Sequence, residues 1–336
     1  MADPRALESA MTQRDVALLR VQGDINRKVN RELKELEGRA VTILRDLDPA
    51  EPKRRGDQFN RVTRVGDFFR EDARRIYRGI ARRYVRSQAE LLQDESDNVV
   101  RMARATGLPL TRRISKEKAE DIAGKLLIDG ATAGSHFNRQ ERGIQDQLQA
   151  TLRKSVVADS TLTQMVQAVR GEKELGYSNG IFRQYERFAR VTVNTGMAAA
   201  SNVARYETYV ANNDVVTMVQ AINPLDTSTS DICRARAGRT WALNSGKAVG
   251  HGNESFPGPP PWHMNCRTTL IPLGREDDPI AGQTFGGLLD SMTEEQQKEM
   301  LGPGKFELWR KGDISMSDLI DQSGRPLTLA QLRERT

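Results

Sequence analysis

The chain has 336 residues, of which 38% are hydrophobic, 29% charged and 5% aromatic, and its formal net charge is +6. This length suits one large domain or two to three ordinary ones. The low aromatic content favours long exposed helices over one deep core. Two cysteines predict no disulfide framework, and no stretch reaches the roughly 18 apolar residues of a membrane span. The start of the sequence lacks the pattern of a secretory signal, so we expect a protein made and assembled in a reducing cytoplasm.

Long helices are predicted for the first part of the chain. Apolar residues recur at steps of three, four or seven between Leu7 and Leu36, a narrow seam typical of a long helix, which Pro49 and Pro52 are expected to end. A second apolar stripe runs from Val62 to Ile80, and a break is expected near Gly107. A third helix is predicted from about Ser115, and it includes the apolar residues Ile122, Leu126, Leu127 and Ile128.

The second predicted helix is strongly basic. Between Arg61 and Arg86 the sequence contains nine arginines and only three acidic residues. A basic face of this kind suits phosphate groups or acidic protein surfaces, although a run of charges is more often simply a solvated helix face. The arginines that we select as candidates for nucleic-acid or partner binding are Arg64, Arg74, Arg75, Arg78, Arg82 and Arg83.

The pattern changes after about residue 155. A short capped helix ending at Gly171 and a longer one rich in small residues precede three predicted strands, in "DVVTMVQAIN", "GRTWAL" and "CRTTLIPL". We therefore predict an α+β fold, with a long, mostly helical N-terminal region, a small α+β domain and a short helical C-terminal tail. The predicted ranges are 1–154 for the extended helical, partner-docking region, 155–275 for the α+β domain and 276–336 for the docking tail.

The stretches "LDTSTSDICRARAGRTW" and "PPPWHMNCRTTL" hold both cysteines and one of the three histidines. We rank three alternatives for Cys233, His263 and Cys266. They form a packed cluster or a late disulfide tie between the cysteines; or they bind zinc; or a cysteine acts as a nucleophile with His263 as its base. A zinc site needs a fourth ligand, for which the candidates are Asp226, Asp231 and His251. We also expect Arg267 to pair with Asp226 or Asp231.

Motifs of common enzymes are missing from the sequence. It contains no phosphate-binding G-x-x-x-x-G-K-[ST] loop, no G-x-S-x-G elbow and no H-E-x-x-H, and three histidines leave few groups for acid–base chemistry. We therefore predict a protein that is not an enzyme, with no catalytic residues and no required cofactor. Two alternatives stay open: a DNA-binding protein that uses the Arg61–Arg86 face, and a metal-dependent hydrolase or nuclease centred on His263.

The two cysteine-containing stretches resemble the head morphogenesis family of tailed bacteriophages that is typified by the phage Mu F protein. The first half of the family's pattern is matched by Asp226, Thr229, Cys233 and Gly238, and the second half by Pro260, Pro261, His263, Cys266 and Arg267. Met264 stands where the pattern has a proline, and Thr268 stands where it has a last cysteine. The resemblance covers roughly residues 155–320.

The resemblance implies a structural role in the phage head. Members of the family are minor head proteins that associate with the portal in small copy number and assist head assembly or the passage of DNA. For this chain it implies the portal protein or the major capsid protein as partner, with packaged DNA as a further contact and no membrane. The expected location is the virion, after assembly in the host cytoplasm.

Overall fold

The structure is a computed structural model that describes residues 3–46, 55–224, 226, 228–250, 254–280, 285–290, 292–321 and 326–335. The chain forms two compact units, and each is assembled from separate stretches of sequence. Unit 1 comprises Met1–Ala17, Ala89–Asp121 and Ala198–Thr336, and unit 2 comprises Leu18–Gln88 and Ile122–Met197. The sequence boundaries at 154/155 and 275/276 remain predictions.

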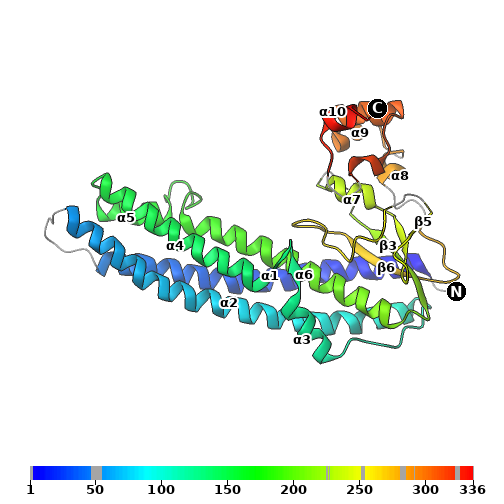
Figure 1. Cartoon of the computed structure of the whole chain (residues 1–336), viewed down its shortest axis with the longest axis horizontal. Helices are drawn as coiled ribbons and strands as arrows, with labels where there is room; N and C mark the ends of the chain where they lie inside the picture. The colour runs from blue at the N-terminus through cyan, green and yellow to red at the C-terminus, as the bar shows by residue number, and fades with distance from the viewer. Residues whose placement is uncertain are drawn as a thin grey trace. The chain divides into compact units, whose positions relative to one another are not determined.

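Helices make up most of the described chain (Figure 1). They are α1 (Pro4–Asp46), α2 (Arg55–Ala105), α3 (Lys116–Lys125), α4 (Ala133–Val157), α5 (Leu162–Arg170), α6 (Ile181–Ala211), α7 (Asp231–Arg236), α8 (Phe285–Asp290), α9 (Glu294–Leu301), α10 (Pro303–Lys311), the 3-10 turn η1 (Met316–Leu319) and α11 (Leu329–Arg333). The prediction of long N-terminal helices, a small region with a sheet and short C-terminal helices is confirmed. None of the described helices is both long enough and apolar enough to cross a membrane.

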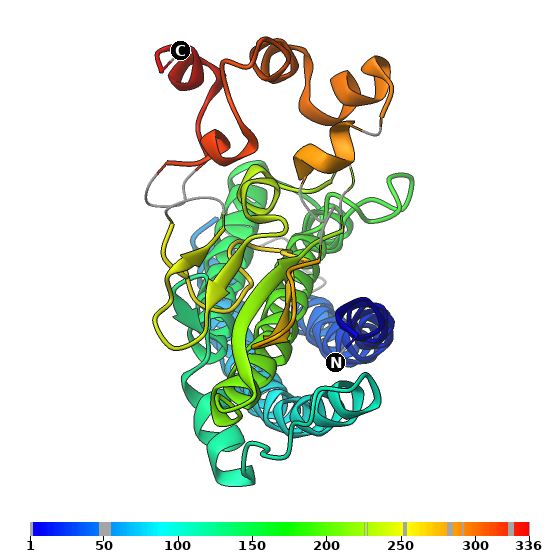
Figure 2. The same ribbon diagram turned by 90° about the vertical axis from the view of Figure 1, so that its right-hand side faces the viewer.

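Unit 1 contains a four-stranded antiparallel sheet with the strand order β5-β4-β3-β6. Its strands are β3 (Val216–Ile222), β4 (Thr240–Ala242), β5 (Ala248–Val249) and β6 (Thr269–Gly274). Val219 of β3 lies opposite Trp241 of β4 and opposite Pro272 of β6, so β3 is the central strand (Figure 2). The three strands predicted from apolar, β-branched runs are confirmed. The short strand β5, in the loop rich in Gly and Pro, was not predicted.

Unit 2 is a helical bundle made from parts of α1, α2 and α6 together with α4 and α5. Within it, the predicted apolar seam of α1 and stripe of α2 are buried, at Leu18, Val29, Leu33, Leu36, Val62, Val65, Phe69, Ala73, Ile76 and Ile80. Ile25 is the member of the seam that remains partly exposed. Pro49 and Pro52, which were expected to end the first helix, lie outside the described residues.

The close approach of α2 and α6 in unit 2 depends on Gly196. A Cβ atom at this position would lie 2.3 Å from Tyr84 Oη and 2.4 Å from Ile128 Cδ1, so a larger residue would force the helices apart. Tyr84 Oη donates a hydrogen bond to the Val193 carbonyl at 3.1 Å, and Gln88 Nε2 donates one to the Gly196 carbonyl at 3.0 Å. The glycine therefore lets buried polar groups of one helix reach the backbone of the other.

The prediction of a third helix was wrong at its C-terminal end. The helix α3 ends before Leu126, and the next residues form β1 (Leu127–Ile128), which pairs with β2 (Ala131–Thr132). Asp129 and Gly130 connect the two strands with φ angles of 49° and 75°. Asp-Gly favours this left-handed two-residue turn in hairpins. A short apolar run fits helix and strand alike, and the Asp-Gly turn that follows it specifies the hairpin.

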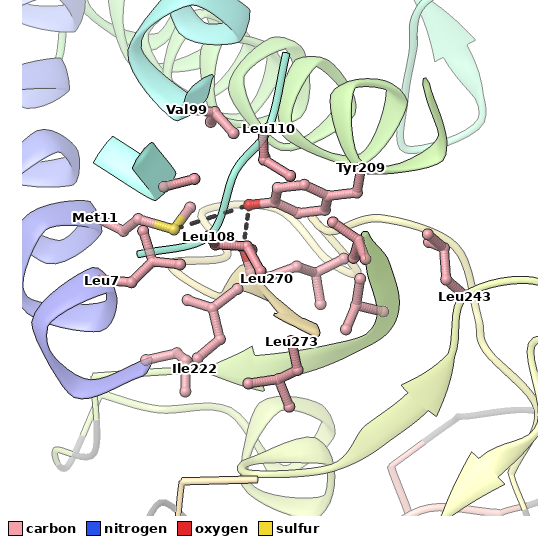
Figure 3. Packing of buried hydrophobic residues seen from close by; sticks show 14 of the residues in the cluster. Leu7, Met11, Val99, Leu108, Leu110, Tyr209, Ile222, Leu243, Leu270 and Leu273 are labelled. Carbon is pink, nitrogen blue, oxygen red and sulfur yellow. Dashed lines mark hydrogen bonds between the residues drawn. The ribbon is translucent and has the colours of Figure 1, made fainter. Parts of the chain in front are cut away.

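The core of unit 1 brings together the start of α1, the end of α2, α6 and the sheet (Figure 3). Figure 3 shows Leu7 and Met11 from α1 near Leu270 from β6, with the ring of Tyr209 from α6 pointing toward them. Tyr209 Oη donates a hydrogen bond to the Leu270 carbonyl at 3.0 Å and lies 3.8 Å from Met11 Sδ. Met11 and Tyr209 are 198 positions apart, so this core closes only when distant parts of the chain meet.

Unit 1 also contains a network of buried charges. The side chains of Arg205 and Glu95 have no exposed surface and lie 2.6 Å apart. Arg205 also contacts Asp15 at 2.7 Å and donates a hydrogen bond to Thr269, and Arg14 reaches Glu95 at 2.8 Å. Burial raises the pKa of Asp15 even though Arg205 opposes this change. Two cations and two carboxylates thus balance one another; Arg205 and Glu95 are shielded from water, and Arg14 and Asp15 are partly exposed.

The C-terminal helices pack onto the segment around α7 within unit 1. One cluster places Leu289, Met300, Leu301 and Phe306 against Ala237. A second cluster places apolar residues of α10, η1 and α11 against Ala235. Apolar side chains of the predicted docking tail therefore hold it against its own unit.

Candidate functional site

Two stretches of sequence about 30 residues apart meet at one cluster in unit 1. The helix α7 carries Cys233, and its N-cap Ser230 accepts a hydrogen bond from the Cys233 backbone N–H at 3.4 Å. His263 and Cys266 lie in the turn that leads into β6, where the Cys266 backbone N–H donates to the His263 carbonyl at 3.2 Å. This turn places the two side chains together on the side that faces Cys233.

The three side chains are in direct contact. Cys233 Sγ lies 3.6 Å from Cys266 Sγ and 3.0 Å from His263 Nε2, and both cysteines are free thiols and buried. His263 Nδ1 lies 2.8 Å from the Met264 carbonyl, and Ser230 Oγ lies 2.7 Å from His263 Nε2. The convergence that we predicted for Cys233, His263 and Cys266 is present in the structure.

Hydrogen bonds within the cluster move the pKa values of the two thiols in opposite directions. The hydrogen bond from the Cys233 thiol lowers the pKa of Cys266, and the bond from His263 lowers it further. The pKa of Cys233 is raised, because its proton is held in the bond to Cys266 and because the thiol is buried. The hydrogen bond to Cys266 also raises the pKa of His263, against the effect of burial.

In the structure Arg267 pairs with Asp226, one of the two acidic partners predicted for it. The two side chains form a bidentate ion pair with distances of 2.6 and 2.7 Å. Asp226 also organises its own turn, since its carboxylate accepts hydrogen bonds from the Ser228 backbone N–H at 2.9 Å and from Thr229 Oγ1 at 3.3 Å. The pair joins the two cysteine-containing stretches at the edge of the cluster.

We expect Asp226→Asn to cost less than about 1 kcal/mol at neutral pH, because both partners of the ion pair are nearly half exposed. The hydrogen bond from Arg267 lowers the pKa of Asp226. A lowered carboxyl pKa adds stability that is present above the ordinary carboxyl pKa and is lost as the pH falls through the lowered one. Urea denaturation of wild type and variant should thus show a difference that disappears in acid; a difference that persists there would contradict this role.

An aromatic group fixes the loop that delivers His263. Trp241 of β4 is fully buried, with its ring centroid 5.5 Å from that of Phe256 and 6.3 Å from that of Trp262. Trp241 Nε1 donates a hydrogen bond to the Glu254 carbonyl at 3.0 Å, and the Arg236 guanidinium lies 4.7 Å from the Trp262 ring centroid. Trp262 is thus a packing residue, and it directly precedes His263.

The carboxylates proposed as a fourth ligand are engaged elsewhere. Asp226 is paired with Arg267, and Asp231 contacts Lys305 and lies 3.4 Å from Arg234. His251 lies outside the described residues. In the described part of the chain, Cys233, His263 and Cys266 form a group of side chains that could hold a metal ion. Their donor atoms all lie within 4.8 Å of one another.

The selected arginines lie exposed on the part of α2 that belongs to unit 2. Three of them have acidic partners: Arg74 lies 3.6 Å from Glu141, Arg75 lies 2.9 Å from Asp72, and Arg83 contacts Glu32. The other three are Arg64, Arg78 and Arg82. Within the described ranges, none of them forms an ion pair with an acidic residue. These three keep their charge available to a partner.

The charge of the chain is divided unevenly between the units. Unit 2 contains 29 Lys and Arg residues against 18 Asp and Glu residues, a net charge of +11. Unit 1 contains 22 against 27, a net charge of −5. The modest net charge of +6 for the whole chain therefore hides a basic helical unit and an acidic unit.

Sequence reasoning missed several groups that shape the cluster. Thr268 was noted only as a departure from the family pattern, yet its hydroxyl donates a hydrogen bond to Cys233 Sγ at 3.1 Å. Ser230 was not singled out, although a serine three residues before Cys233 at the start of a helix is a signal for an N-cap. The Met264 carbonyl has no signal in the sequence, because any residue type supplies the same atom.

Comparison of the chain with protein-family models, with curated proteins and with solved structures gives no match.

Proposed function

We propose that the chain is a structural, non-enzymatic protein of a tailed-phage head that associates with the portal protein or the major capsid protein. Its place of action is the virion, and its task is to assist head assembly, DNA packaging or DNA ejection. Unit 2 supplies the partner-binding helices, and the region around α7 and β6 is a small rigid module.

The observation that carries the proposal is the convergence of the residues that resemble the family pattern. Asp226 and Cys233 come from one stretch, and His263, Cys266 and Arg267 come from the other. The ion pair of Asp226 with Arg267 and the contacts among Cys233, His263 and Cys266 join these stretches residue by residue. A pattern whose separate halves meet in space is better explained by a shared module than by chance similarity.

The test uses heads of a phage whose genome encodes the chain. Mass spectrometry of purified, DNA-filled heads should detect the chain at a small fraction of the copy number of the major capsid protein. Chemical crosslinking of the same heads should join unit 2 to the portal or the capsid protein. Absence of the chain from heads that are otherwise complete would overturn the proposal.

A second candidate function is DNA binding by unit 2, which is favoured by its net charge of +11. Lysines and arginines that neutralise phosphates release counterions, so affinity falls steeply as salt rises. The exposed arginines of α2 without an acidic partner in the described part of the chain provide such contacts. This activity is compatible with a position close to packaged DNA.

We expect Arg78→Gln/Arg82→Gln to weaken double-stranded DNA binding without sequence preference. Each lost phosphate contact should reduce the slope of log K against log salt by about 1, so the double variant should lose about 2. Fluorescence anisotropy at several salt concentrations measures the slope. The matched control is Arg310→Gln/Lys311→Gln, which removes two exposed charges from unit 1 and should leave the slope unchanged. Equal slopes for all three proteins would remove this function.

A further inference from the structure

The donor atoms of Cys233, His263 and Cys266 surround one point in unit 1. We propose that this cluster binds a single zinc ion through the two sulfur atoms and His263 Nε2, with a solvent molecule as fourth ligand. Two thiolates and one imidazole are soft and borderline donors, and zinc is the common divalent ion that prefers such a set in tetrahedral geometry. The proposal rests on the geometry of the cluster and is independent of the role in a phage head.

The spacing of the donor atoms fits a tetrahedral ion. With a zinc–sulfur distance of about 2.3 Å, two sulfur ligands at the tetrahedral angle lie about 3.8 Å apart. Cys233 Sγ and Cys266 Sγ lie 3.6 Å apart, and His263 Nε2 lies 3.0 Å from Cys233 Sγ. With a zinc–nitrogen distance of about 2.05 Å, a sulfur and a nitrogen ligand at the tetrahedral angle lie about 3.5 Å apart. The two sulfur atoms must therefore separate by about 0.2 Å, and His263 Nε2 must move away from Cys233 Sγ by about 0.5 Å, to reach ligand positions. A disulfide would instead require an S–S distance of about 2.05 Å.

The imidazole of His263 presents the correct nitrogen. Its Nδ1 lies 2.8 Å from the Met264 carbonyl, which can only accept a hydrogen bond, so the proton of the neutral ring is on Nδ1. The Nε2 lone pair then points at Cys233 Sγ and Ser230 Oγ. Histidines that bind metals usually have this arrangement, with the other ring nitrogen donating to a carbonyl or carboxylate.

The sulfur atoms have the surroundings of metal ligands. Cys233 is 3% exposed and Cys266 is 4% exposed, so water does not compete for them freely. Thr268 Oγ1 donates a hydrogen bond to Cys233 Sγ at 3.1 Å, which stabilises negative charge on the sulfur. Such outer hydrogen bonds orient ligands and contribute to metal affinity. Simple packing of two thiols needs neither this donor nor the oriented imidazole.

A small cavity next to the cluster leaves room for the fourth ligand. It has a volume of about 20 Å³ and is lined by residues that include Ser230, Cys233 and His263. A cavity of about 10–15 Å³ holds one water molecule when polar partners are present. Ser230 Oγ lies 2.7 Å from His263 Nε2 and can bond to a solvent ligand there. The carboxylates nearest in sequence, Asp226 and Asp231, are held by basic partners.

The experiment uses the full chain, purified with a reductant and without added chelator. We expect elemental analysis to find one zinc per chain and intact-mass measurement to find two free thiols once the metal is removed. Replacement of zinc by Co²⁺ should produce the thiolate-to-cobalt charge-transfer band and the intense visible bands of a tetrahedral site. Absence of both bands at saturating Co²⁺, or an oxidised cysteine pair in place of the metal, would overturn the proposal.

Variants assign the ligands. His263→Asn should lower the affinity for Zn²⁺ by at least about 100-fold, which exceeds the range for loss of an outer partner. The matched control is His136→Asn in unit 2, whose ring bonds to the Ile128 carbonyl and which should leave the affinity unchanged. Equal affinities for these two variants would exclude His263 as a ligand.

Thr268→Cys tests the geometry by adding a ligand instead of removing one. Because the Thr268 hydroxyl lies 3.1 Å from Cys233 Sγ, a thiol at this position can reach the ion in place of solvent. We expect tighter Zn²⁺ binding and a stronger charge-transfer band in the Co²⁺ form. This gain cannot result from unfolding, so it remains decisive even if a Cys233→Ser variant does not fold. An unchanged spectrum would contradict the proposed position of the metal.

Discussion

Arg205→Met should lower the free energy of unfolding by about 3–5 kcal/mol, because removal of the buried cation leaves its two carboxylate partners short of compensating positive charge. Glu95 would keep Arg14 as its cation but would lose its 2.6 Å contact with Arg205 while remaining fully buried. Asp15 would lose its 2.7 Å contact as well. Urea denaturation followed by circular dichroism measures the loss.

The control and the double variant separate burial from charge. Lys116→Met removes one partner of an exposed pair in the same unit, with Glu120 4.0 Å away, and should cost less than about 0.5 kcal/mol. Arg205→Met/Glu95→Gln removes both fully buried charges and should recover a large part of the lost stability. If Arg205→Met cost no more than Lys116→Met, the network would not be essential to unit 1.

Trp241→Ala should cost unit 1 about 3–5 kcal/mol, the range for truncation of a large buried aromatic residue. The substitution removes the side chain that packs between Phe256 and Trp262, together with the hydrogen bond to the Glu254 carbonyl. The loop before His263 would thereby lose its attachment to the sheet. Hydrogen exchange of the β3 amides, read by mass spectrometry, reports the loss in unit 1.

Two variants calibrate this result. Trp241→Phe keeps an aromatic ring in the core but lacks the indole N–H, so it should cost clearly less than the alanine variant. Trp309→Ala removes a partly buried tryptophan of α10 and should leave the β3 amides nearly as protected as in wild type. Equal loss of protection in Trp241→Ala and Trp309→Ala would show that Trp241 has no special part in holding the sheet and its loop.

Periodicity predicted the long helices well, because burial on one face leaves a regular apolar pattern. The stripe from Val62 to Ile80 is buried on α2 as expected. The same reasoning failed at Leu127 and Ile128, because a run of three apolar residues is too short to distinguish strand from helix. The Asp129-Gly130 turn decides the outcome there, since both positions need a left-handed backbone.

The residues of the candidate site could be predicted from the sequence, but their geometry could not. The rarity of cysteine and histidine singled out Cys233, His263 and Cys266, and charge singled out the pair of Asp226 with Arg267. The contact of Thr268 with Cys233 depends on how β6 lies against α7, which no local pattern specifies. Arg205 was missed for a similar reason, since its partners Asp15 and Glu95 are 190 and 110 positions away.

The division of α1 between the two units sets an order for folding during synthesis. Unit 2 is complete once Met197 has been made, whereas Leu7 and Met11 of unit 1 must wait for Leu270. At about 5–20 residues per second on the ribosome, that wait lasts roughly 10–50 s. During this time the apolar face at the start of α1 can meet the end of α2 but not the sheet, which completes the cluster around Leu7 and Met11. The growing chain therefore carries a half-covered apolar segment, and a holding chaperone would have its longest opportunity to bind there.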